Sequence, residues 1–83
     1  MQLPTTVNPP HCLQLRPGKI AFTRIASHIY NLSLSNSNKL YFLGRIEQKS
    51  NYLWAVTHVH CQHCVPEYFD DWQQATLYLV SLY

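Results

Sequence analysis

Two short polar segments constrain the fold of this chain most strongly, because each lies between segments rich in apolar and aromatic residues. Residues 35–38 are Ser-Asn-Ser-Asn, and residues 49–51 are Lys-Ser-Asn. Such residues favour tight turns. A tight turn between two strands makes those strands antiparallel neighbours. The pattern therefore predicts an antiparallel sheet in the middle of the chain.

Three apolar segments flank these turns and carry the alternation that is typical of strands. They cover residues 20–34, 40–47 and 52–60. The first segment alternates clearly only in its second half. Residues 19–29 also fit a helical spacing, so a helix remains an alternative to a strand there.

The alternation in the second apolar segment predicts which side chains lie on the same face of the strand. Leu40, Phe42 and Ile46 are expected to share one face of the strand, because side chains two positions apart point the same way. Gly44 lies among them and indicates a bulge or a point of close approach.

The C-terminal segment predicts a helix. Asp70 can cap it, and Gln73 three residues later approximates a capping box. The residues expected to face the sheet follow at helical spacing, namely Trp72, Ala75, Leu79 and Leu82. Residues 77–83 are apolar on nearly every side, which indicates burial on more than one face.

These elements predict an α+β fold, in which a three-stranded antiparallel meander packs on one C-terminal helix (β-β-β-α). The chain of 83 residues is expected to be a single domain, 1–83. Within it, prolines punctuate residues 1–18, which are expected to form an extended arm before a globular core at 19–83. Leu13 and Leu15 could form a short edge strand within the arm.

Composition favours a protein that binds another protein. Charged residues are 12% of the chain, about half the usual share, whereas aromatic residues are 13%. A small domain cannot bury all of these rings, and exposed apolar surface often marks an interface. The main hypothesis is a non-enzymatic interaction module, an adaptor or an accessory subunit that self-associates. Its candidate partner-binding residues are Tyr41, Tyr52, Trp54, Tyr78 and Tyr83.

Nucleic-acid binding is an alternative function. All six basic residues precede residue 50, and the net charge is +2. A sheet face could carry the four basic residues that fall on or beside the first two strands, Arg24, Lys39, Arg45 and Lys49. Tyr41 and Tyr52 could stack on bases. Four cations make a weak patch, because phosphate contacts supply most of such affinity.

A cysteine–histidine cluster is the stretch of the chain that is richest in reactive and metal-ligating side chains. Cys61 and Cys64 form a C-x2-C half-site for zinc, to which His58 or His60 could add a third ligand and Cys12 a fourth. The strand must end near His60, since otherwise neighbouring side chains point to opposite faces. No second half-site follows in the sequence. We therefore expect free thiols and no cofactor, and zinc binding is the alternative.

Catalysis is not expected. Gly18 and Gly44 are the two glycines of the chain, which excludes a glycine-rich phosphate loop. A C-x2-C redox centre needs a helix that opens at the motif, but Pro66 and a loop follow Cys64. The N-terminus has no signal-peptide pattern, and no apolar run approaches the roughly 20 residues that span a membrane. A cytoplasmic location without membrane contact is therefore expected.

Overall fold

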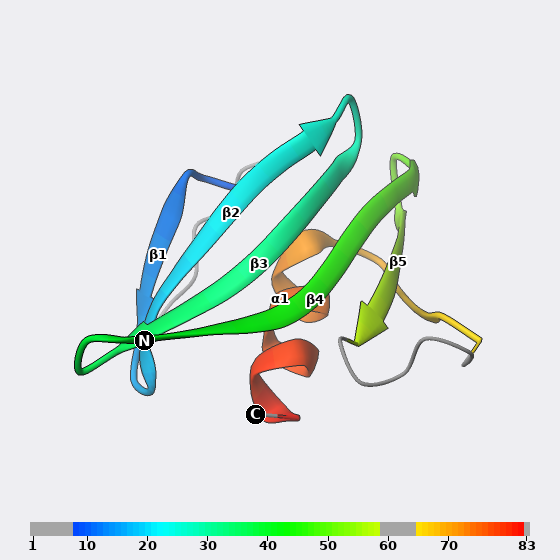
Figure 1. Ribbon diagram of the computed structural model, residues 1–83. Helices are drawn as coiled ribbons and strands as arrows, with labels where there is room; N and C mark the ends of the chain where they lie inside the picture. The colour runs from blue at the N-terminus through cyan, green and yellow to red at the C-terminus, as the bar shows by residue number, and fades with distance from the viewer. Residues whose placement is uncertain (1–7, 59–64, 83) are drawn as a thin grey trace.

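The computed structural model describes residues 8–58 and 65–82. This part of the chain forms six strands and one helix (Figure 1). In chain order they are β1 (Cys12–Leu15), β2 (Gly18–Ala26), β3 (Ile29–Asn36), β4 (Lys39–Ser50), β5 (Leu53–His58), β6 (Glu67–Phe69) and α1 (Trp72–Ser81). The strands make one antiparallel sheet, in which every strand pairs with its neighbours in sequence.

The predicted three-stranded meander is therefore wrong, because the sheet has six strands and makes up most of the described chain. The segment 20–34 is two strands that meet at a turn of Ser27 and His28. This outcome excludes a helix over residues 19–29. Residues 12–15, inside the expected arm, form β1 and confirm the short edge strand. Glu67 and Tyr68, expected in a loop, belong to β6.

Two-residue turns join the first five strands, at residues 16–17, 27–28, 37–38 and 51–52. In the β3–β4 turn, Ser37 and Asn38 have φ values of 49° and 69°. Positive φ at both central residues is the signature of the hairpin turn whose twist matches that of the strands. The predicted turn at 35–38 is thus confirmed, and the one at 49–51 lies one to two residues further on.

A bulge in β4 changes which of its side chains reach the core. Leu32 pairs with Gly44, but the next residue, Ser33, pairs with Phe42, so Leu43 is an extra residue in the strand. An extra residue reverses the alternation that follows it. Ile46 is consequently buried, whereas Phe42 is exposed. The prediction that Leu40, Phe42 and Ile46 share a face is wrong for this reason.

The helix begins one residue later than Asp70 suggests. Asp71 is its N-cap, and the Oδ1 atom of this residue accepts a hydrogen bond of 2.8 Å from the backbone N–H of Gln74. The buried face consists of Trp72, Ala75, Thr76 and Leu79. Leu82, expected on that face, is exposed.

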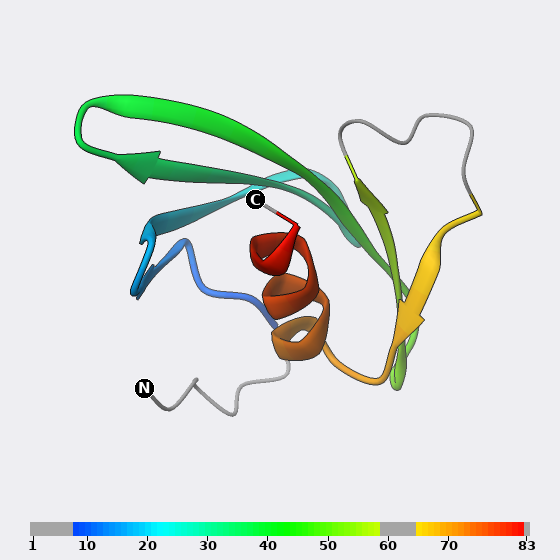
Figure 2. The ribbon, with the colours of Figure 1, turned by 90° about the horizontal axis from the view of Figure 1, so that it is seen from below.

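The sheet curves strongly, and α1 lies in its concave side (Figure 2). The helix contacts β4, β5 and β6. Leu77 and Leu82 are exposed, so the expected burial of residues 77–83 on more than one face is wrong for these two side chains. The core between the two layers consists of side chains from β1 to β5 and from α1, with Trp54 and Trp72 the largest that are fully buried. Among the described residues, no helix combines the length and apolar character needed to cross a bilayer.

Candidate functional site

The five aromatic residues predicted to bind a partner have different environments. Trp54 is 2% exposed and belongs to the core. Tyr41 and Tyr78 are half-buried against that core, and the ring of Tyr78 lies 5.1 Å from the ring of Phe69. Tyr52, in the turn after β4, is 80% exposed. Tyr83 lies outside the described residues. Of the described four, only Tyr52 offers a largely exposed ring.

Two other exposed apolar residues lie close together on one strand. Leu40 is 71% exposed and Phe42 is 47% exposed. They are two positions apart on β4 and precede the bulge, so both point to the convex side of the sheet, away from α1. Their neighbours on β3 are the small residues Ser35 and Ser33. We call Leu40 and Phe42 the outer patch. Figure 2 shows the β3–β4 hairpin that carries it reaching past the helix.

The basic residues proposed for nucleic-acid binding are spread along the sheet. Lys39 and Lys49 lie near opposite ends of β4, and a strand rises by about 3.3 Å per residue. Arg24 lies at the far end of β2, where its Nε donates a hydrogen bond of 3.3 Å to the carbonyl of Ala26. Arg45 contacts the Oδ1 atom of Asn31 at 3.4 Å. The four side chains therefore do not form one patch.

One of these cations is also neutralised. The Nζ atom of Lys49 lies 3.0 Å from the Oε2 atom of Glu47, two residues earlier on β4. Both side chains are exposed, so the ion pair contributes little to stability. It does reduce the attraction that Lys49 can offer to a phosphate.

Part of the predicted zinc cluster, His60, Cys61 and Cys64, lies outside the described residues. Cys12 is on β1 and His58 is on β5, so three strands lie between them. Register also separates them. Cys12 pairs with Ala21 on the convex side, whereas His58 pairs with Gly44 on the concave side. In the described part of the chain, no three His, Cys, Asp or Glu side chains gather as a metal site would require.

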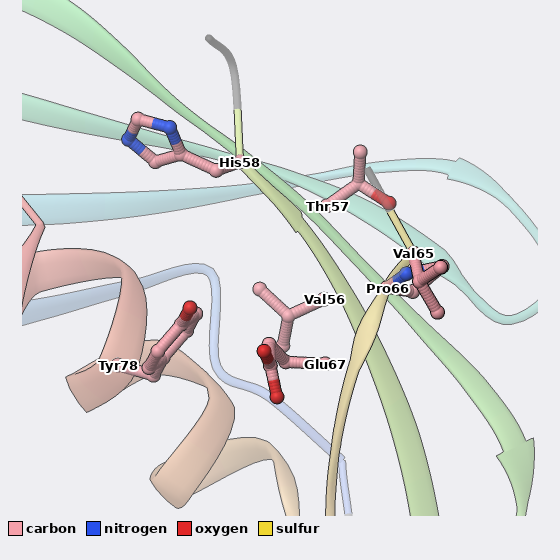
Figure 3. Close-up of a pocket in the computed structure, with 7 residues that line it drawn as sticks. All are labelled: Val56, Thr57, His58, Val65, Pro66, Glu67 and Tyr78. Atoms are coloured by element: carbon pink, nitrogen blue, oxygen red, sulfur yellow. The ribbon is translucent and has the colours of Figure 1, made fainter. Parts of the chain in front are cut away.

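A small pocket lies where β5, β6 and α1 meet (Figure 3). Its polar lining consists of Thr57, His58, Glu67 and Tyr78, and Val56 points toward Tyr78 across it. The volume is about 160 Å³. Typical ligand pockets are roughly 300–1,000 Å³, so this pocket is too small for an organic ligand of ordinary size.

A larger groove lies at the opposite end of the sheet. It has a volume of about 630 Å³ and is lined by residues 8–11, 22–24, 27–28 and 30. Three segments that are separate in sequence therefore build it: the chain before β1, the end of β2, and the β2–β3 turn with the start of β3. We call it the Arg24 groove. The sequence patterns did not predict this groove. The one signal for it was the polar pair Ser27-His28, which interrupts an apolar segment and indicates a turn.

Comparison of this chain with known protein families, with curated protein sequences and with solved structures found no match.

Proposed function

We propose that this chain is a small non-enzymatic protein-interaction module of the cytoplasm, and that it self-associates through the outer patch. The observation that carries the proposal is the exposure of Leu40 and Phe42 on one face of one strand. Burial of apolar surface contributes about 25 cal/mol per Å². Two large apolar side chains held side by side on a sheet therefore favour contact with a second apolar surface.

A second copy of the chain fits the patch by symmetry. A two-fold axis through the convex face sets two β4 strands antiparallel and face to face. Leu40 of one copy then meets Phe42 of the other, and the reverse contact forms as well. The small side chains of Ser33 and Ser35 on β3 leave room beside the patch for the partner's larger side chains. Residues on the turn Ser37–Asn38 have fixed positive φ values, so the hairpin is already shaped for the contact.

Self-association accounts for the exposed surface better than nucleic-acid binding does. The four candidate basic residues lie at separate places on the sheet, and Lys49 is paired with Glu47. Phosphate contacts need cations that act together. The outer patch, in contrast, combines its two apolar side chains on adjacent outward positions of a single strand.

Light scattering across about 10–500 μM protein tests the proposal. The mass is expected to rise toward twice the 9.7 kDa of one chain. The variant Leu40→Glu/Phe42→Glu should stay monomeric, because it sets like charges against each other across the two-fold axis. Tyr52→Glu is the matched control, since it charges a more exposed aromatic residue away from the patch and should associate as the original chain does.

Salt distinguishes the proposed contact from a charge-driven one. Apolar association should persist at 1 M NaCl, where the Debye length falls to about 3 Å. An original chain that remains monomeric at about 500 μM would overturn the proposal. Equal association of the double Glu variant would also overturn it, because the contact would then lie elsewhere.

A further inference from the structure

We propose that the Arg24 groove binds a small organic phosphate, that is, a phosphate group joined to a flat ring such as a nucleobase. The groove faces the end of β2 and the β2–β3 turn, whereas the outer patch lies on the first residues of β4. This inference therefore does not depend on self-association. The groove's volume of about 630 Å³ lies within the range of small-molecule sites.

The polar lining of the groove suits an anion. Arg24 is its charged residue, and no aspartate or glutamate is among the described residues that line it. His11 and His28 can donate through their imidazole N–H groups, and Ser27 through its hydroxyl. Several donors that converge on one space match the oxygens of a phosphate, which accept hydrogen bonds in different directions.

One hydrogen bond restrains the guanidinium of Arg24. Its Nε donates to the carbonyl of Ala26, two residues along the chain. That bond restrains the guanidinium and does not use its two terminal NH₂ groups. Such a planar fork matches two phosphate oxygens at once. Among residues 8–58 and 65–82, Arg24 takes part in no ion pair.

The apolar lining suits a flat ring. Tyr30 is half-buried in the groove wall, and the centroid of its ring lies 6.3 Å from that of Trp54. Pro9 and Pro10 line the groove from the chain before β1. Aromatic rings stack on nucleobases with little regard to base identity, so Tyr30 can hold a ring while Arg24 holds the phosphate.

The walls are fixed before any ligand arrives. The carbonyl of His11 accepts a hydrogen bond of 2.9 Å from the backbone N–H of Phe22, which ties the chain before β1 to β2. The carbonyl of His28 accepts one of 2.8 Å from the N–H of Gln48, which ties the β2–β3 turn to β4. A preformed site loses less entropy on binding than a flexible one.

Titration of ¹⁵N-labelled protein with adenosine 5′-monophosphate, followed by NMR, tests the inference. We expect saturable shifts at the amides of His11, Ser27 and His28, with a Kd tighter than about 1 mM. Adenosine lacks the phosphate and should bind at least about tenfold more weakly. Arg24→Gln should weaken binding by about 10- to 100-fold, because a charge-assisted hydrogen-bonding group is lost.

Arg45→Gln is the matched control, since it removes the same charge on the convex side of the sheet and should bind as the original chain does. Ser27→Asp provides a second test that leaves Arg24 intact, because a carboxylate in the groove repels the phosphate. The ¹⁵N spectra show that each variant is folded. The inference is overturned if adenosine 5′-monophosphate gives no saturable shifts, if adenosine binds equally well, or if Arg24→Gln and Ser27→Asp bind like the original chain.

Discussion

The ring of Phe22 meets the ring of Trp72 edge to face, with centroids 5.5 Å apart and planes at 84°. This geometry sets the positive edge of one ring against the negative face of the other. The contact joins β2 to the first residue of α1, near the other end of the chain. Both side chains are buried. The pair therefore links the start of α1 to β2, a strand near the opposite edge of the sheet from β6.

Phe22→Leu is expected to reduce the free energy of unfolding by about 1–2 kcal/mol, because it removes the ring contact and leaves a small void. Urea denaturation followed by tryptophan fluorescence measures the change. Phe42→Leu makes the same substitution on the exposed face and should stay within about 0.5 kcal/mol. Equal losses in the two variants would contradict the assignment of these residues to opposite faces.

Asp71 stabilises the start of α1 through its side chain, which accepts the 2.8 Å hydrogen bond from the N–H of Gln74. Asp71→Ala should cost about 1 kcal/mol, as the loss of an N-cap usually does. Thermal unfolding followed by circular dichroism gives the value. Asp70→Ala is the control, and it should change the stability by less than about 0.5 kcal/mol. A larger loss from Asp70→Ala would move the cap to the residue that the sequence first suggests.

Gly44 lies where the bulge of β4 meets the helix, and its φ is +152°. A Cβ atom there would lie 2.3 Å from the carbonyl oxygen of Thr57 and 3.0 Å from a methyl carbon of Leu79. Gly44→Ala should therefore destabilise the protein by about 2–4 kcal/mol, through backbone strain and overlap together. Ser35→Ala, at an exposed position on β3, should be nearly neutral in the same urea experiment. A Gly44→Ala variant as stable as the original chain would refute the close approach.

Thr76 is completely buried on α1, and its hydroxyl has no hydrogen-bond partner in the described structure. A buried polar group without a partner costs free energy. Thr76→Val keeps the shape and removes the hydroxyl, so it should raise the free energy of unfolding by about 1 kcal/mol. Thr76→Ser keeps the hydroxyl and loses a methyl group, so it should be destabilising by about 1 kcal/mol. The opposite order of the two variants would show that the hydroxyl is satisfied.

The sequence predicted the turn and the helix start, because each depends on a few residues that are adjacent in the chain. The turn at Ser37–Asn38 follows from residues that accept positive φ, and the helix start follows from an aspartate before an apolar stripe. The turn at Ser27–His28 was missed because Ile29 and Tyr30 continue the apolar content beyond it. Strand β6 was missed because Pro66 is typical of a loop, while the pairing of this strand with β5 is a contact between separate segments.

The outer patch and the Arg24 groove depend on structure that no single segment encodes. Phe42 becomes exposed only because the bulge at Leu43 shifts the register against β3. The groove needs His11 and Arg24 side by side, and the hydrogen bond between the His11 carbonyl and Phe22 brings their segments together. In the sequence Arg24 is one of several bases, without a reason to separate it from Lys39.

The order of the strands in the sheet, in which each pairs with the next in the chain, has a consequence for how the protein folds. Two-residue turns mean that the chain closes only short loops to form β1 to β5, and short loops cost little entropy. Folds with such a low contact order reach the native state faster than sheets whose partners are distant in sequence. The slow step should be the docking of α1, because its contact with Phe22 joins residues about fifty positions apart in the sequence.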